Sequence, residues 1–118
     1  NRGLAYNGLK QYDKAIADYN KAIALDPNNV KAYNNRGNVY HDLKQYDKAI
    51  ADYNKAIELD PNYVYTYYNR GLAYHNLEEH PQAIADYKKA LSLLPPTDSY
   101  YPIIQKNLQE AQFLLNKP

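Results

Sequence analysis

The sequence repeats itself with a period of 34 residues, and this repeat constrains the fold more than any other feature. Residues 9–23 are identical to residues 43–57. An Arg-Gly pair keeps the same period, at Arg2-Gly3, Arg36-Gly37 and Arg70-Gly71. Such self-similarity indicates one supersecondary unit used several times, with neighbouring units stacked on each other rather than wrapped around one central core.

Each unit has the pattern of two helices. Residues 30–43 and 46–59 place apolar side chains at positions i, i+3, i+4 and i+7, which is the spacing of one helix face. Asn29 and Asn62 precede predicted helices and can cap them. The pattern therefore predicts an antiparallel helix pair in each unit.

Gly37 and Gly71 lie in the middle of predicted helices, where glycine costs about 1 kcal/mol relative to alanine. We expect another helix to cross at each glycine, so closely that a side chain would not fit. The matching small surface is expected to consist of Ala49, Ala56, Ala83 and Ala90.

The second and third units share a longer motif. The second unit reads Tyr33-x2-Arg36-Gly37-x2-Tyr40, then Ala49-x3-Tyr53, then Pro61. The third reads Tyr67-x2-Arg70-Gly71-x2-Tyr74, then Ala83-x3-Tyr87, then Pro95. Both resemble the tetratricopeptide repeat (TPR) pattern W-x2-L-G-x2-Y, A-x3-F, P, with Tyr for Trp and Phe and Arg for Leu. The resemblance implies an all-α fold, a right-handed α-solenoid of antiparallel helix hairpins with units 1–29, 30–63 and 64–97.

The last segment, residues 98–118, departs from the repeat. Residues 100–115 have the pattern of one helix, with Asp98 or Ser99 as its cap and Pro102 in its first turn. Its apolar stripe consists of Ile104, Leu108, Ala111 and Leu115. Because a solenoid needs an end unit with a polar outer face, we interpret this segment as a C-terminal capping helix.

Charge and cysteine content exclude several classes of partner. The 14 basic and 13 acidic residues are interspersed, without the basic footprint of a nucleic-acid binder or the polybasic patch of a membrane-surface binder. Cysteine is absent, and no apolar run approaches the roughly 20 residues that span a bilayer. We expect no nucleic-acid or membrane partner, no cofactor and a cytoplasmic location.

The sequence offers little for catalysis or metal binding. The Ser and Thr residues lie outside known nucleophile motifs, and the four glycines are isolated, so there is no phosphate-binding loop. His41 and His75 lie one period apart, but no third ligand stands at metal-binding spacing. We interpret them as polar residues of an open helix face, with hydrogen bonding to a ligand as the alternative. No enzymatic activity and no metal site are predicted.

A repeated pairing of Arg and Asp carries more information. An Arg stands where the family has an apolar residue, and a guanidinium near a helix interface needs a partner to offset its desolvation. We hypothesise an Arg–Asp ladder, within or between units; the alternative is that the arginines bind a ligand carboxylate. The ladder residues are Arg2, Arg36, Arg70, Asp18, Asp52 and Asp86.

The resemblance implies a concave groove lined by the first helix of each hairpin, where partners dock. Tyr65 and Tyr68 are expected on its exposed face, since aromatic side chains with a polar end are enriched at binding hot spots. By position, the groove residues are Leu4, Asn7, Lys31, Asn34, Asn35, Asn38, His41, Tyr65, Tyr68, Asn69, Leu72, His75 and Asn76.

These features favour a non-catalytic module that binds a peptide or protein segment. Some family members hold acidic chaperone tails with a carboxylate clamp, but at most two of its five residues match here in either register, so strong binding of such tails is not predicted. One alternative is a scaffold segment that self-associates, either through the N-terminal face, because Asn1 aligns with Asn35 inside a helix, or through the capping helix. A further alternative is an RNA-binding repeat, which the balanced charge of the chain disfavours.

Overall fold

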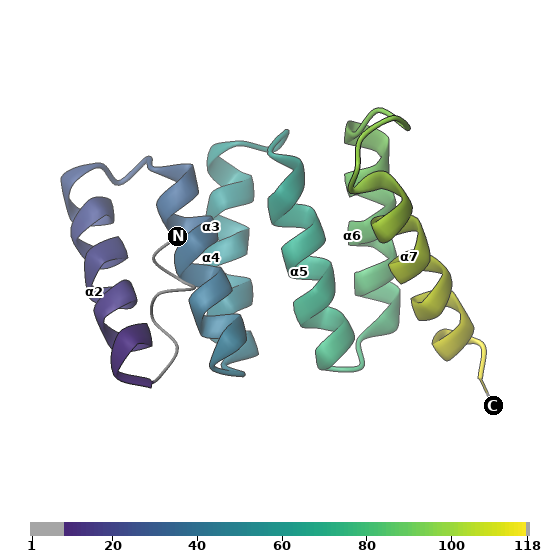
Figure 1. Ribbon diagram of the computed structural model, residues 1–118, viewed down its shortest axis with the longest axis horizontal. Coiled ribbons are helices and arrows are strands. Elements are labelled where there is room, and N and C mark those ends of the chain that lie inside the picture. The colour runs from purple at the N-terminus through teal and green to yellow at the C-terminus, as the bar shows by residue number, and fades with distance from the viewer. Residues whose placement is uncertain (1–8, 118) are drawn as a thin grey trace. The chain divides into compact units, whose positions relative to one another are not determined.

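The computed structural model describes residues 9–117, and within this range the backbone forms six α-helices and no strand (Figure 1). The helices are α2 (Leu9–Leu25), α3 (Val30–Asp42), α4 (Tyr46–Leu59), α5 (Val64–Asn76), α6 (His80–Leu93) and α7 (Tyr101–Leu115). The predicted all-α class is thereby confirmed. Arg2, Leu4 and Asn7, assigned to the ladder or the groove, lie outside the described residues.

The chain divides into two compact units, Asn1–Pro61 and Asn62–Pro118. The first contains α2, α3 and α4, and the second contains α5, α6 and α7. Within each unit, helices that follow one another in sequence pack side by side and run in alternating directions (Figure 1). No helix between residues 9 and 117 is both long and apolar enough to cross a membrane.

Both hairpins turn at a residue with a left-handed backbone. Lys44 has φ 63° between α3 and α4, and Glu78, one period later, has φ 60° between α5 and α6. The amide that follows Lys44, that of Gln45, donates to the carbonyl oxygen of Tyr40 at 2.8 Å. This bond closes the end of α3 in the manner of a Schellman motif, with a lysine where glycine is usual.

The two hairpins begin differently. The Asn29 side chain accepts a hydrogen bond from the backbone N of Ala32 at 3.1 Å, so its predicted role as a helix cap is confirmed. The same prediction for Asn62 is wrong, because Tyr63 is the residue that precedes α5 and its side chain makes no capping bond. Tyr63 stands in register with Asn29, whereas Asn62 is in register with Asn28.

The close approach predicted at the two helical glycines is confirmed. A Cβ on Gly37 would lie 2.7 Å from Cε1 of Tyr53, and one on Gly71 would lie 2.8 Å from Cε1 of Tyr87. Both tyrosines are buried, so each ring fills the space over a glycine. The group that approaches each glycine is therefore an aromatic ring and not the predicted alanine surface. The four alanines are nevertheless buried: Ala49, Ala56, Ala83 and Ala90.

The capping helix α7 packs on α6 in the second unit (Figure 1). Ile104 and Ala111 of the predicted apolar stripe are buried, whereas Leu115 is exposed. Pro102 lies in the first turn, where its missing N–H is not needed. Asp98 accepts a hydrogen bond from the backbone N of Tyr100 at 2.8 Å, which orders the chain just before the helix.

Candidate functional site

One Arg–Asp pair joins the two helices of each complete hairpin. Nε and Nη2 of Arg36 donate to the two carboxylate oxygens of Asp52 at 2.8 and 2.6 Å. Arg70 makes the same bonds to Asp86 at 2.9 and 2.7 Å. Both carboxylates are buried, and the hydrogen bonds that each arginine donates to its paired Asp raise the pKa of that arginine. Both described pairs lie within one hairpin.

Arg36 also contacts a third helix of its unit. Its Nη1 donates to the side-chain oxygen of Asn20, in α2, at 2.8 Å. The guanidinium carbon lies 5.6 Å from the centre of the Tyr33 ring, within range of a cation–π interaction. Because all three nitrogens of Arg36 bond inside the unit, this arginine serves packing, and the alternative that it binds a ligand carboxylate is disfavoured.

A chain of five tyrosine rings runs through the second unit. The ring centres lie 5.7 Å apart for Tyr63 and Tyr65, 5.6 Å for Tyr65 and Tyr100, 6.4 Å for Tyr100 and Tyr68, and 6.2 Å for Tyr68 and Tyr87. The first three of these rings meet edge to face, an arrangement that favours aromatic pairs. This series of rings thus extends from the surface of the unit to its buried core.

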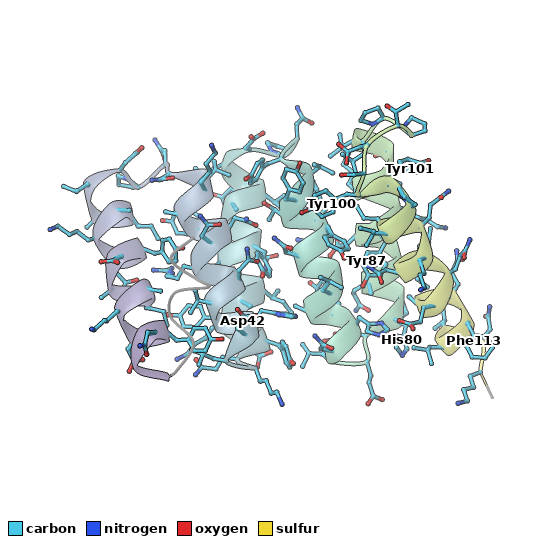
Figure 2. The ribbon with its side chains drawn as sticks, in the orientation of Figure 1. Asp42, His80, Tyr87, Tyr100, Tyr101 and Phe113 are labelled. Atoms are coloured by element: carbon cyan, nitrogen blue, oxygen red, sulfur yellow. The ribbon has the colours of Figure 1, made fainter. Side chains whose placement is uncertain are left out.

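Tyr65 and Tyr100 are the exposed members of this series of rings. Tyr65 of α5 is 38% exposed and Tyr100, just before α7, is 43% exposed, although their rings touch. Figure 2 shows Tyr100 on the side of α7 that faces α5, and Tyr87 deeper in the unit. The capping helix therefore adds an aromatic residue to the face of α5 on which Tyr65 was predicted.

Tyr68 is less accessible than the sequence predicted. It is half-buried, and its hydroxyl accepts a hydrogen bond from Nδ2 of Asn107, in α7, at 2.9 Å. Tyr100 and Asn107 were not among the predicted site residues, because the 34-residue register does not extend into α7. The signal available was that Tyr100 and Asn107 continue the helical spacing of Ile104 and Ala111, so they border the buried stripe of α7.

His41 in the first unit and His75 in the second contact different neighbouring side chains. Nε2 of His75 lies 3.7 Å from a carboxylate oxygen of Glu110, and the rings of His75 and His80 are 5.6 Å apart. His41 packs against the Tyr46 ring at 5.2 Å, and burial lowers its pKa. Among residues 9–117, no group of three His, Cys, Asp or Glu side chains could hold a metal ion.

Two of the predicted groove residues in the first unit face inward. Asn34 is only 4% exposed, so the prediction that it meets a ligand is wrong in this conformation. Asn38 is half-buried, and its side-chain oxygen accepts a hydrogen bond from the Tyr53 hydroxyl at 2.6 Å. The remaining groove residues are at least partly accessible: Lys31, Asn35, His41, Asn69, Leu72, His75 and Asn76.

Family models match most of the chain. A model described as TPR repeat matches residues 3–44 and 37–78, and one described as tetratricopeptide repeat matches residues 64–95. No curated protein matches the chain.

Several solved structures are similar to it. The first TPR of Spaghetti (RPAP3) bound to HSP90 peptide SRMEEVD is 30% identical, with a TM-score of 0.83 over 92% of this chain and 82% of that one. The complex of the TPR2B domain of yeast Sti1 with pHsp70 is 27% identical, with a TM-score of 0.84 and coverage of 95% and 91%. The Arabidopsis OM64 TPR domain is 32% identical, with a TM-score of 0.78 and coverage of 92% and 89%.

Proposed function

Because the chain belongs to the tetratricopeptide repeat family, we propose that it is a non-catalytic module that binds a peptide or protein segment. Two similar solved structures support this proposal, since each is a TPR domain in complex with an HSP90 peptide or with pHsp70. The described residues offer hydrogen-bonding side chains and aromatic rings rather than an activated nucleophile or a metal centre.

The proposed site is a surface of the second unit, here named the tyrosine face. It consists of Tyr65, Tyr68, Tyr100, Ile103 and Asn107. Ile103 belongs to it because it follows Tyr100 by three residues and precedes Asn107 by four, so all three share one helical face. Ile103 is also exposed.

The observation that carries the proposal is the contact between Tyr65 and Tyr100. Two rings from different segments touch each other and still expose more than a third of their surface. Each ring is held by its neighbour, so a ligand that packs on the pair orders few additional side-chain rotamers. Rigid aromatic anchors of this kind dominate the energetics of peptide interfaces.

Replacement of both rings tests the site. The double variant Tyr65→Ala/Tyr100→Ala should lose binding to peptides selected by the wild-type protein from a displayed random library. Phe113→Ala is the matched control, because Phe113 is an aromatic of the same unit that is 68% exposed, near the far end of α7 (Figure 2). Unchanged affinity of the double variant would place the site elsewhere.

A second candidate function, self-association, is favoured by exposed apolar side chains at the end of α7. Phe113 and Leu115 are exposed there, apart from the tyrosine face. Sedimentation over a wide concentration range separates the two functions: a mass that rises with concentration, and returns to the monomer value in Phe113→Ser, supports association through this end.

A further inference from the structure

The tyrosine face is rich in hydrogen-bond donors. The hydroxyls of Tyr65 and Tyr100 make no hydrogen bond to any of the described residues. The Tyr68 hydroxyl accepts from Asn107, which leaves its own proton available to donate. An incoming segment therefore meets hydroxyl protons beside aromatic ring faces, and its carbonyl oxygens are the natural acceptors for them.

The same face carries no basic side chain. The nearest arginine in the unit, Arg70, is bound to the buried carboxylate of Asp86. Lys106 precedes Asn107 and is therefore rotated by about 100° around α7. Asp98, whose side chain accepts a hydrogen bond from the backbone N of Tyr100, adds a carboxylate next to this face. A ligand carboxylate would find no cation on the tyrosine face.

We infer that the tyrosine face binds a proline-rich segment in the polyproline II conformation, and this inference depends on the peptide-binding function proposed above. Proline rings pack flat against aromatic faces, and this extended helix leaves its carbonyl oxygens without internal partners. Its backbone is already ordered before binding, so little conformational entropy is lost. Proline also lacks an N–H, so the ligand is mainly an acceptor, the complement of a surface rich in donors.

Spacing along α7 agrees with this ligand. Tyr100 and Asn107 are separated by seven residues, or about 10 Å along a helix axis. One turn of polyproline II advances by about 9 Å. The ring centre of Tyr68 lies 6.4 Å from that of Tyr100, so a proline on the Tyr65–Tyr100 pair would bring a carbonyl oxygen, within one turn of the peptide, near the Tyr68 hydroxyl that Asn107 holds in place. Ile103 lies between these two points and extends the apolar surface.

Two peptides test the class of ligand by calorimetric titration. One is an acetylated and amidated peptide of Pro-Pro-Leu repeats, and the other is SRMEEVD with a free carboxylate, the peptide bound in a similar solved structure. The wild-type chain should bind the proline peptide more tightly. Tyr65→Ala/Tyr100→Ala should weaken that binding at least about tenfold, a loss of about 1.4 kcal/mol. Phe113→Ala should leave it unchanged.

A conservative variant separates the contributions of the rings and the hydroxyls. Tyr65→Phe/Tyr100→Phe keeps the aromatic surface and removes two donors, so it should weaken binding by a smaller factor than the alanine variant. Circular dichroism of each variant establishes that the helices remain folded. Equal affinity of wild type and the phenylalanine variant would overturn the donor argument.

The outcomes distinguish the ligand class from the function itself. If SRMEEVD binds more tightly than the proline peptide and is lost in Tyr65→Ala/Tyr100→Ala, the ligand class is wrong and the peptide site stands. If the folded wild-type chain binds neither of these peptides nor any selected from a random library, both the inference and the proposed function fail.

Discussion

Arg36 donates to both carboxylate oxygens of Asp52, and Arg70 repeats this geometry with Asp86 one period later. The family pattern has an apolar residue at the arginine position. A charged residue is accommodated there because its partner stands on the facing helix of the same hairpin, 16 residues away in both cases.

Breaking one pair should destabilise its unit. We expect Asp52→Ala to lower the free energy of unfolding by about 3 kcal/mol, because Arg36 would be left partly buried without its counter-charge. The double variant Arg36→Leu/Asp52→Ala should lose less, since no unpaired charge remains. Urea denaturation followed by circular dichroism measures both values. An Asp52→Ala protein as stable as wild type would contradict a packing role for the pair.

Adding a methyl group at either helical glycine should also be destabilising. Alanine is the better helix former by about 1 kcal/mol, but its Cβ on Gly37 would meet the Tyr53 ring at 2.7 Å. Overpacking of a buried site costs about 1–3 kcal/mol, so Gly37→Ala should lower the free energy of unfolding. Tyr53→Leu in the same background should relieve part of the clash, and a double-mutant cycle in urea would measure this coupling.

The buried tyrosines make the fold sensitive to alkali. Burial raises the pKa of both Tyr53 and Tyr87 above the ordinary value near 10. Above that value the unfolded chain releases protons that the folded chain retains, so the free energy of unfolding should fall as pH rises beyond about 10. Urea denaturation at increasing pH measures this fall. Tyr53→Phe should reduce its steepness, and an identical pH dependence would contradict the prediction.

His41 should make the free energy of unfolding fall as the pH is lowered. Burial lowers the pKa of His41 below its usual value near 6.5, despite the neighbouring Asp42. The unfolded chain then binds a proton more readily than the folded one. Stability from the neutral imidazole is present above about pH 6.5 and is lost as pH falls through the folded-state pKa. The slope of unfolding free energy between about pH 7 and pH 5 should therefore be smaller in His41→Gln than in wild type.

The helices and their pairing could be predicted from the sequence because both depend on local periodicity and on a repeat. The cap at Asn29 and the close approach at Gly37 were predicted from single residues whose preferences have one main structural cause. The prediction that Asn62 caps α5 was wrong because the third unit has Tyr63 at the capping position. The general preference of asparagine for helix caps placed the predicted cap one residue too early.

The tyrosine face could be predicted only in part. Tyr65 and Tyr68 belong to the repeat, and their register placed them on one face of α5. Tyr100 immediately precedes α7 and Asn107 lies in it, and no earlier unit supplies a register for this segment, so their contacts depend on tertiary packing. Asn34 was misassigned for a related reason, since helical spacing identifies a face but does not show what covers it.

The Arg–Asp pair is the same in both complete hairpins, although the flanking residues differ: Lys31 and Asn34 in one stand where Tyr65 and Tyr68 are found in the other. The Arg–Asp pair that joins the two helices of a hairpin is thus chemically independent of the residues that the hairpin exposes. Such a division makes the chain a natural host for grafting, in which new recognition residues are installed at the exposed positions of Lys31 and Tyr65 while the Arg and Asp of each pair are left untouched.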